Sequence, residues 1–342
     1  MFFTIRKNLL SLALLVSVTA AGQASAETLI NGAGATFPYP IYSKWFSEYA
    51  KVDPTVKFNY QSIGSGGGIK QIMAGTVDFG ASDKFLTDEE LKAAPGKLIH
   101  IPTVMGAVVV TYNLPGVAKG LKLKSEDVAD IFLGKITKWN DRRISDDNPR
   151  VNLPNEPIIV VHRSDGSGTT SIFTNYLCGI NREWASKVGT GASVKWPIGL
   201  GGKGNEGVAG QVKNTKNSIG YVELAYAFEN KLPYAYLQNK SGVFVEPSIK
   251  TTSAAAAGAV KNMPADYRIS LVNQPGKDSY PIVGFTWLLI YEHQKDVANG
   301  KKLVEFLKWE LHKGQKMAAP LLYAPLPESV AKMVEKTIET IK

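Results

Sequence analysis

Cysteine and histidine are scarce in this sequence. Its 342 residues include a single cysteine, Cys178, which cannot form an internal disulfide, and this excludes a small disulfide-stapled scaffold. Because apolar and aromatic residues surround it, we expect Cys178 to be a small buried side chain on a helix face. The histidines show neither an HExxH motif nor paired spacing, so they give no basis for a metal site or metal cofactor; they are His100, His162, His293 and His312.

A long hydrophobic run is also missing. The mostly apolar stretch Leu9–Ala20 is shorter than the roughly 20 residues that a membrane-spanning helix needs. It follows the basic pair Arg6-Lys7 and precedes the small-x-small sequence Ala24–Ala26, which is the pattern of a secretory signal peptide. We therefore expect residues 1–26 to be cleaved, leaving 316 residues with a net charge of +7 as a soluble protein of the bacterial periplasm.

The excess of basic residues is modest. The chain has 39 Lys and Arg against 30 Asp and Glu, with 44% apolar and 20% charged residues, a composition typical of a globular protein of about two domains. A basic protein can bind nucleic acid, but the lysines are dispersed, as in Lys119–Lys124 and Lys135–Lys138, and no aromatic residues are arranged between them for base stacking. We expect a solvated basic surface and no nucleic-acid partner.

Hydrophobic periodicity predicts strands that alternate with helices. Short runs of alternating or continuous apolar residues predict strands, and apolar residues three or four positions apart predict helices. This alternation favours an α/β fold with mainly parallel sheets. The expected strands cover 28–33, 56–60, 77–81, 107–112, 157–162 and 280–291, and the expected helices cover 69–74, 125–134, 169–177, 300–313 and 328–342, with a further helix that starts at Pro38.

Small and hydroxyl residues cluster where three predicted strands give way to helices, at Gly34–Pro38, Gly64–Gly68 and Asp165–Thr170. The first N–H groups of a helix lack intrahelical partners and carry a partial positive charge, so a helix start can bind an anion, and glycine allows close approach. Each segment alone could be an ordinary cap or turn. Arg163 favours an anion site, because its guanidinium suits a tetrahedral oxyanion and Asp165 can orient it; the alternative is an ordinary surface ion pair.

Asp83 places a carboxylate just after the predicted strand 77–81. It could be only a cap for a helix that starts near Thr87. If it faces a bound anion, unit charges about 4 Å apart repel by ~4 kcal/mol at an effective dielectric of about 20, which is roughly three decades of affinity. A ligand that keeps a proton at neutral pH, as phosphate does and sulfate does not, forms a charge-assisted hydrogen bond with the carboxylate instead. Asp83 would therefore select phosphate over sulfate.

Five motifs closely resemble, in order, those of the periplasmic phosphate-binding proteins of ABC phosphate transporters, the PstS type. They span nearly the whole chain after the signal peptide and are Gly32–Pro38, Tyr60–Gly68, Val77–Asp83, Arg163–Thr169 and Val194–Asn205. One departure is Gly66, where relatives often have a second serine. The neighbouring Ser65 is intact, so the departure affects only fine tuning of the site.

The resemblance implies a two-lobed type II periplasmic binding protein that closes over inorganic phosphate. Each lobe would be a mainly parallel sheet flanked by helices, with a two-strand hinge between lobe I (27–103 and 282–342) and lobe II (104–281). It further implies a monomer without enzymatic activity or cofactor, whose partners are phosphate and the membrane permease subunits of the transporter. In the implied site Asp83 accepts the ligand proton, Asp165 pairs with Arg163, and the donors are Thr36, Phe37, Ser65, Arg163, Ser167, Gly168 and Thr169.

A secreted phosphatase is the first enzymatic alternative. Ser167 or Asp83 could act as a nucleophile. However, no histidine stands beside Ser167 as a base, and the His and Asp ligands of a metal-bridged phosphatase are not nearby in the sequence.

A dinucleotide-binding motif is the second alternative. Gly199–Gly204 matches G-x-G-x-x-G, and Glu223 follows about 20 residues later, as such a fingerprint requires. Trp196-Pro197 interrupts the strand that should precede the glycines. We therefore expect a structural loop that leads to a helix near Gly207–Val212.

Overall fold

The computed structural model describes residues 27–342, and the predicted signal peptide over 1–26 lies outside these described residues. Within 27–342, none of the helices has both the length and the apolar composition that a membrane span requires. Its strands are β1 (Thr28–Gly34), β2 (Val56–Ser62), β3 (Phe79–Ser82), β4 (Leu98–Asn113), β5 (Lys122–Leu123), β6 (Ile159–Arg163), β7 (Leu200–Gly202), β8 (Ser218–Glu223), β9 (Tyr236–Gln238), β10 (Phe244–Val245) and β11 (Val283–Tyr291).

Helices separate most of these strands in the chain, as the periodicity predicts. They are α1 (Tyr39–Val52), α2 (Ser65–Met73), α3 (Asp88–Lys92), α4 (Ser125–Phe132), α5 (Arg142–Ser145), α6 (Gly168–Ile180), α7 (Arg182–Lys187), α8 (Gly204–Asn214), α9 (Leu224–Glu229), α10 (Ile249–Ala259), α11 (Val297–His312) and α12 (Glu328–Ile338). Three short 3-10 helices complete the set: Val260–Asn262, Gly314–Met317 and Ala319–Leu321.

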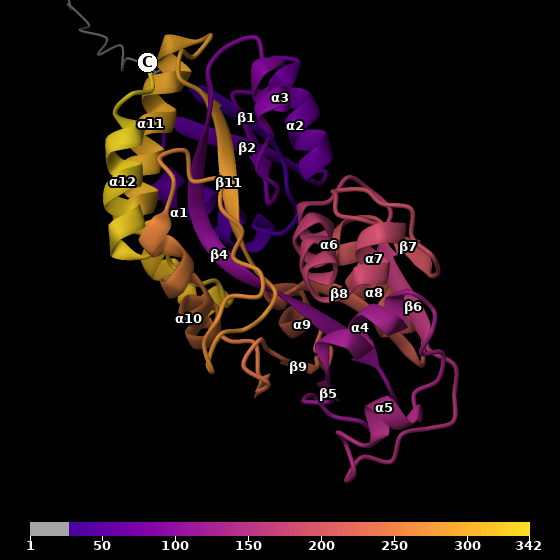
Figure 1. The fold of residues 1–342 in the computed structure, drawn as a ribbon. Coiled ribbons are helices and arrows are strands. Elements are labelled where there is room, and N and C mark those ends of the chain that lie inside the picture. Colours follow the sequence, from indigo (N-terminus) through magenta and orange to yellow (C-terminus); the bar gives the residue numbers. More distant parts are fainter. Residues whose placement is uncertain (1–26) are drawn as a thin grey trace, which may run out of the picture.

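Two groups of strands and helices lie side by side and join through β4, which confirms the expected two-lobed α/β fold (Figure 1). In lobe I, β1 pairs in parallel with β2 and β3, and in lobe II, β6 pairs in parallel with β7 and β8. The long β4 pairs antiparallel with β11 over its first part and with β8 from Val108 onward. The two sheets therefore merge into one curled sheet with the order β2-β1-β3-β11-β4-β8-β6-β7.

The strand expected at 107–112 begins earlier, at Leu98. The pairing of β4 with β11 shifts register between Thr286 and Trp287, opposite Thr103, which leaves one extra residue in β4. Proline lacks an N–H and occurs within strands at such irregularities, so Pro102 beside the bulge does not end the strand.

Aromatic side chains form the core of lobe I on one side of its sheet. The face of α1 predicted from its apolar spacing is buried, including Tyr42 and Trp45. The rings of Phe46, Phe58 and Phe306 pack with centroids 4.5 to 5.5 Å apart, which joins α1, β2 and α11. This burial removes large apolar surfaces from water and fixes the position of the loop that precedes α1.

Lobe II has its own aromatic core between β8 and the helix α6. Phe173 of α6 stacks on Tyr221 of β8 at 4.3 Å, and Phe132 of α4 packs edge-on against Phe173 at 4.8 Å. Cys178 packs against this core but is only partly buried, so the expectation of a buried side chain was wrong in its degree of burial. These aromatic residues of both lobes belong to one continuous hydrophobic cluster, which holds the loops that face each other between the lobes.

The helix after Ser62 starts earlier than expected. Gly66, Gly67 and Gly68 were expected to break the chain before Ile69, but they lie inside α2, which begins at Ser65. Glycine is needed here for close packing: a Cβ on Gly68 would lie 2.5 Å from Gly34 Cα and 2.6 Å from the Ala33 carbonyl oxygen. The glycines thus let α2 approach the backbone of β1.

Candidate functional site

Four helix starts converge between the two lobes. Lobe I contributes the loop before α1 and the first residue of α2, and lobe II contributes the starts of α6 and α8. Sequence reasoning predicted the first three; α8 was expected near Gly207 but begins at Gly204. The predicted site residues are all buried within this junction, apart from the half-buried Asp165; they are Thr36, Phe37, Ser65, Asp83, Arg163, Ser167, Gly168 and Thr169.

Ser65 joins the two lobes. Its hydroxyl oxygen accepts hydrogen bonds from the backbone N–H of Asp83 in lobe I and of Gly168 in lobe II, both at 3.1 Å. Next to it, Gly66 N–H donates to the Gly166 carbonyl at 2.8 Å. A Cβ on Gly168 would lie 2.4 Å from Ser65 Oγ and 2.5 Å from Asp83 Oδ2, so only glycine permits this approach. The starts of α2 and α6 are therefore in direct contact.

Asp83 lies at the end of β3 with 3% of its surface exposed. It does not cap α3, because Thr87 fills that role with a capping box. Its Oδ1 accepts a hydrogen bond from the Thr286 hydroxyl at 2.8 Å. Burial raises the pKa of Asp83 to about 7, although Thr286, Arg163 and Ser65 lower it in part. The site thus contains a carboxyl group that can change its charge near neutral pH.

Arg163 is buried at the end of β6 and forms a two-bond ion pair with Asp165. Its Nε donates to Asp165 Oδ1 at 2.8 Å and its Nη2 donates to Oδ2 at 2.7 Å. Burial opposes ionisation of Asp165, but the guanidinium holds its pKa below the ordinary value. With the arginine side chain only 1% exposed, this is not a surface pair, and the aspartate fixes the plane of the guanidinium.

Asn205 at the start of α8 connects two of the predicted donors. Its Nδ2 donates to Thr36 Oγ1 at 2.7 Å and to Thr169 Oγ1 at 3.1 Å, and its Oδ1 accepts from the Glu223 N–H at 2.9 Å. Sequence reasoning assigned it no role, although it ends the fifth family-like motif. No local signal marks it, because its partners lie 169 and 36 residues away in the chain.

Two tyrosines hold the loop before α1. The Tyr226 hydroxyl, from α9 in lobe II, donates to the Thr36 carbonyl at 2.6 Å, and the Tyr323 hydroxyl donates to the Phe37 carbonyl at 2.6 Å. These two hydrogen bonds occupy the carbonyl groups of Thr36 and Phe37, which leaves N–H and O–H groups of the loop to face the junction. In lobe II, Ser167 caps α6 by accepting from the Thr170 N–H at 3.0 Å.

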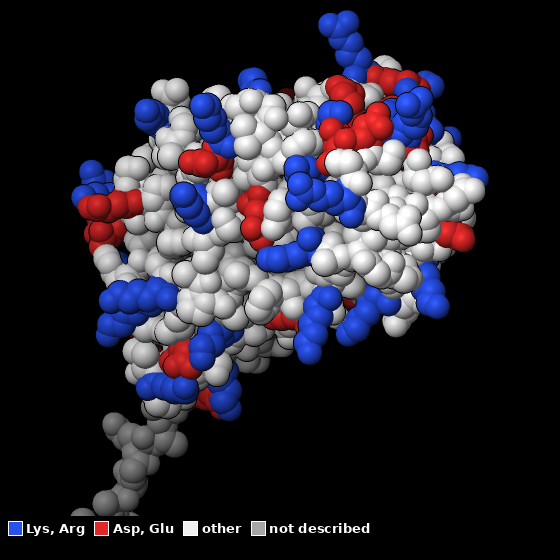
Figure 2. All heavy atoms as spheres, turned by 90° about the horizontal axis from the view of Figure 1, so that it is seen from below, with Lys and Arg blue, Asp and Glu red and all other residues white. Residues whose placement is uncertain are grey.

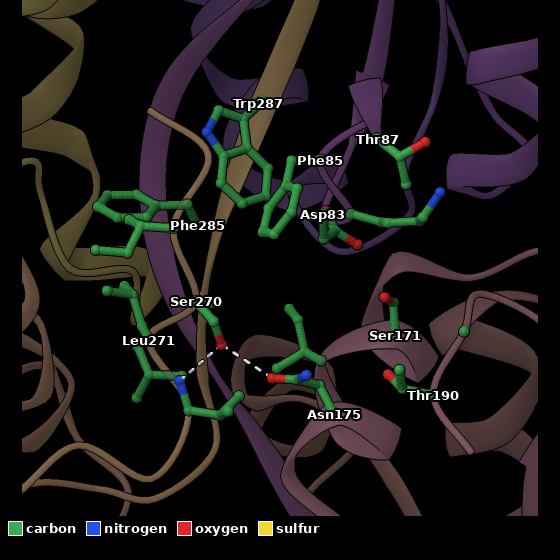
Figure 3. Close-up of a pocket in the computed structure, with 17 residues that line it drawn as sticks. Asp83, Phe85, Thr87, Ser171, Asn175, Thr190, Ser270, Leu271, Phe285 and Trp287 are labelled. Atoms are coloured by element: carbon green, nitrogen blue, oxygen red, sulfur yellow. Dashed lines mark hydrogen bonds between the residues drawn. The ribbon is translucent and has the colours of Figure 1, made fainter. Parts of the chain in front are cut away.

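A cavity of about 300 Å³ opens beside Asp83. Figure 3 shows Phe85 and Trp287 on one side of it and Ser171, Asn175 and Thr190 on the other. Of the predicted site residues, only Asp83 lines this cavity. Its walls come from both lobes, and the other predicted residues lie outside it, where the helix starts meet.

The phosphatase alternative lacked a histidine beside Ser167, and His162, the histidine that precedes Ser167 in the sequence, stacks on Trp196 with ring centroids 4.7 Å apart. The dinucleotide alternative depends on Glu223. The Glu223 side chain is buried, and its Oε2 accepts from the Ala225 N–H as the cap of α9, so it is not placed as the acidic residue of a dinucleotide site. Among residues 27–342, no group of three or more His, Cys, Asp and Glu is arranged to hold a metal.

The surface charges are interspersed on the face shown in Figure 2, where Lys and Arg alternate with Asp, Glu and uncharged residues. Several basic side chains are paired with acids, among them Lys119 with Glu246 at 2.8 Å and Lys124 with Asp147 at 2.8 Å. On this face, the dispersed pattern offers no continuous basic track for a nucleic-acid backbone.

Comparisons with known proteins show the family and the fold of this chain. The chain matches a family model described as a PBP superfamily domain over residues 19–312. It is 49% identical to phosphate-binding protein PstS of Pasteurella multocida, covering 98% of this chain and 96% of that protein, and 43% identical to phosphate-binding protein PstS of Methanocaldococcus jannaschii, covering 92% and 86%. A solved structure of a phosphate-binding protein from Stenotrophomonas maltophilia shares the fold, with a TM-score of 0.70, 19% identity and coverage of 90% and 93%.

Proposed function

This chain belongs to the PstS family of phosphate-binding proteins within the PBP superfamily, and from that premise we propose that it binds inorganic phosphate for transport. Members of this family are binding proteins and not enzymes. The single observation that carries the proposal is the buried junction of helix starts, Arg163 and Asp83 between two lobes. Helix starts and a fixed guanidinium are suited to a small oxyanion.

The ligand groups of the proposed site come from both lobes. Thr36, Phe37 and Ser65 donate from lobe I, and Asp83 accepts the ligand proton. From lobe II the donors are Arg163, Ser167, Gly168 and Thr169, with Asp165 as the partner of Arg163. Because hydrogen bonds to a charged group contribute about 1.5–3 kcal/mol each, several such donors can bind phosphate tightly without a metal or cofactor.

Asp83 is the proposed selectivity element. The ionised carboxylate accepts a hydrogen bond from a phosphate that keeps a proton, and it repels sulfate, which has none at neutral pH. The observations that support this role are the burial of Asp83 and its contact with Gly168 and Ser65, which are themselves proposed donors.

The proposed lobes are 27–103 with 282–342, and 104–281. Rotation about β4 and the segment before β11 would open and close the site. We further propose that the signal peptide 1–26 directs the protein to the periplasm, where a monomer delivers phosphate to the permease subunits of an ABC transporter and does not bind nucleic acid.

Calorimetric titration tests the binding function directly. Protein freed of bound anions by unfolding and refolding is titrated at pH 8 with phosphate, arsenate and sulfate. We expect tight binding of phosphate and of arsenate, which is protonated in the same way, and no binding of sulfate at millimolar concentration. Absence of phosphate binding by folded protein would refute the function, and tight sulfate binding would refute the role of Asp83.

A further inference from the structure

The hydroxyl groups of the proposed phosphate site have partners that determine where their protons point. A threonine or serine hydroxyl can donate one hydrogen bond and accept two, so by itself it does not discriminate between ligand atoms that accept and ligand atoms that donate. We propose that Asn205 is a positioning residue that makes Thr36 and Thr169 act as donors toward the bound anion. This inference rests on the proposed function and concerns its specificity.

The orientation of the Asn205 amide is fixed by the backbone. The Glu223 N–H, 2.9 Å from Asn205 Oδ1, can only donate a hydrogen bond. The amide oxygen must therefore face β8, and the NH₂ group must face the site. Both of its protons are then available to Thr36 and Thr169, which lie 2.7 and 3.1 Å from Nδ2.

Thr36 has no accepting capacity left for the ligand. Its Oγ1 accepts from Asn205 Nδ2 at 2.7 Å and from the Asn205 backbone N–H at 3.2 Å. With both lone pairs directed at N–H groups, the hydroxyl can interact with a further partner only by donating its proton. Asn205 of lobe II thus directs the hydroxyl proton of Thr36 in lobe I.

The Thr169 hydroxyl, in lobe II, has a similar set of hydrogen-bond partners. Its Oγ1 accepts from Asn205 Nδ2 at 3.1 Å and faces Arg163 Nη1 at 3.5 Å. Ser65 reaches the same state without Asn205, because the backbone N–H groups of Asp83 and Gly168 both donate to its oxygen. Asn205 therefore orients two of the four buried hydroxyls among the proposed donors, and backbone N–H groups orient Ser65; the fourth, Ser167, accepts from the Thr170 N–H.

The consequence is that Asp83 is the acceptor among Thr36, Ser65, Thr169 and Asp83. If the hydroxyls could rotate, they could accept protons from a ligand, and the protonation state of the ligand would be recognised poorly. With Thr36, Ser65 and Thr169 restricted to donation, three of the four hydroxyls leave the ligand proton to Asp83. Asn205 thus contributes to recognition of a phosphate that presents one proton to Asp83 and bare oxygens to the other donors.

Two variants of Asn205 and one control variant distinguish orientation of the hydroxyl protons from a purely structural contribution of Asn205. Asn205→Asp keeps the shape but offers oxygens that turn the Thr36 and Thr169 protons away from the ligand. Asn205→Leu removes the amide without adding charge. Asn155→Asp, at an exposed position of lobe II, is the matched charge control. By calorimetry at pH 8 we expect the phosphate Kd to rise about 100-fold for Asn205→Asp, about 10-fold for Asn205→Leu, and less than about 2-fold for the control.

The pH profile is a readout that a structural role would not change. Protonation of the new carboxyl restores a donor, so the Kd ratio of Asn205→Asp to Asn205→Leu should fall as pH falls from 8 to 5. The charged groups on neighbouring elements are the same in both variants and cancel in this ratio; they are Arg163 and Asp165 beside β6, Lys203 and Glu206 at α8, and Glu223 of β8. A ratio of about one at all pH values would overturn the inference.

A double-mutant cycle keeps the test valid if Asn205→Asp fails to fold. In a Thr36→Val background, one of the oriented hydroxyls is gone, so Asn205→Leu should weaken phosphate binding by less than in the parent protein. Equal losses in both backgrounds would refute orientation of Thr36 by Asn205. If the parent protein itself fails to bind phosphate, the proposed function is refuted; if the parent binds and the Asn205 variants bind equally well, only this inference fails.

Discussion

Replacing Asp83 with asparagine should make the ligand-free protein more stable at alkaline pH. Burial raises the pKa of the Asp83 carboxyl from 3.8 to about 7. For a carboxyl with a raised folded-state pKa, the folded state holds the proton more tightly than the unfolded state. The contribution of Asp83 to the free energy of unfolding is therefore most favourable below pH 3.8. It falls as pH rises from about 4 to 7 and then stays level. The amide introduced by Asp83→Asn carries no charge and can still accept the hydrogen bond from Thr286.

The size of this effect follows from the shift. A change of about 3 pKa units at 1.36 kcal/mol per unit corresponds to about 4 kcal/mol for the ionised form. Between pH 5 and pH 8 the linkage relation gives a loss of about 2 to 3 kcal/mol in the free energy of unfolding, because the carboxyl of the unfolded chain is already ionised at pH 5. Other buried acids titrate as well, so the quantity to compare is the difference between the parent protein and Asp83→Asn at each pH.

Urea denaturation of anion-free protein at pH 5 and pH 8 measures this difference. We expect Asp83→Asn to gain about 2 to 3 kcal/mol relative to the parent protein between these two pH values. Asp146→Asn, at an exposed surface position, is a control that should show no comparable change. A constant difference between the parent and Asp83→Asn across this range would refute the description of Asp83 as a buried titrating carboxyl.

The same titration determines when sulfate can bind. Above pH 7 the ionised Asp83 repels sulfate, whereas below pH 7 the protonated carboxyl can donate to a sulfate oxygen. We therefore expect millimolar sulfate to compete with phosphate at pH 5 but not at pH 8 in the parent protein, and at both pH values in Asp83→Asn. Competition that is independent of pH in the parent protein would contradict this account.

Three further predictions test separate parts of the site. Arg163→Lys replaces the fork held by Asp165 with a single ammonium, so the phosphate Kd should rise by about 10- to 100-fold in calorimetry; an unchanged Kd would remove Arg163 from the site. Gly68→Ala places a methyl group 2.5 Å from Gly34 Cα and should lower the unfolding free energy by about 3 kcal/mol. The control Gly210→Ala has open space around it and should be neutral or stabilising. Equal effects of the two substitutions would contradict the packing argument. Tyr226→Phe removes the hydrogen bond to the Thr36 carbonyl and should raise the phosphate Kd by about 5- to 10-fold, and wild-type affinity would show that this contact does not stabilise the closed site.

Local sequence patterns determined most of the secondary structure. Alternating apolar residues in β2 and the spaced apolar face of α1 identify a strand and a helix, because burial of one face requires a period of about two or 3.6 residues. The patterns failed where local and tertiary demands differ. Gly66–Gly68 read as a break although they lie in α2, and the strand expected from residue 107 begins at Leu98 and continues through Pro102.

The chemistry of the predicted anion site could also be read from the sequence. Gly, Ser and Thr at the ends of strands mark helix starts, and Arg163 with Asp165 two residues later marks a fixed guanidinium, since these are contacts within a few residues. Asp83 was identified by its charge among such donors. The motif resemblance then placed these segments in one family, which the 49% identical relative supports.

Only the tertiary structure decided which groups touch. Ser65 meets Gly168 across 103 positions, Asp83 meets Thr286 across 203, and Asn205 meets Thr36 across 169. Such contacts depend on how two lobes fold around β4, and no local period encodes them. The sequence by itself therefore supplied the donors and the carboxylate, whereas burial, which shifts the pKa of Asp83, and hydrogen bonding, which orients the hydroxyl protons, came from the fold.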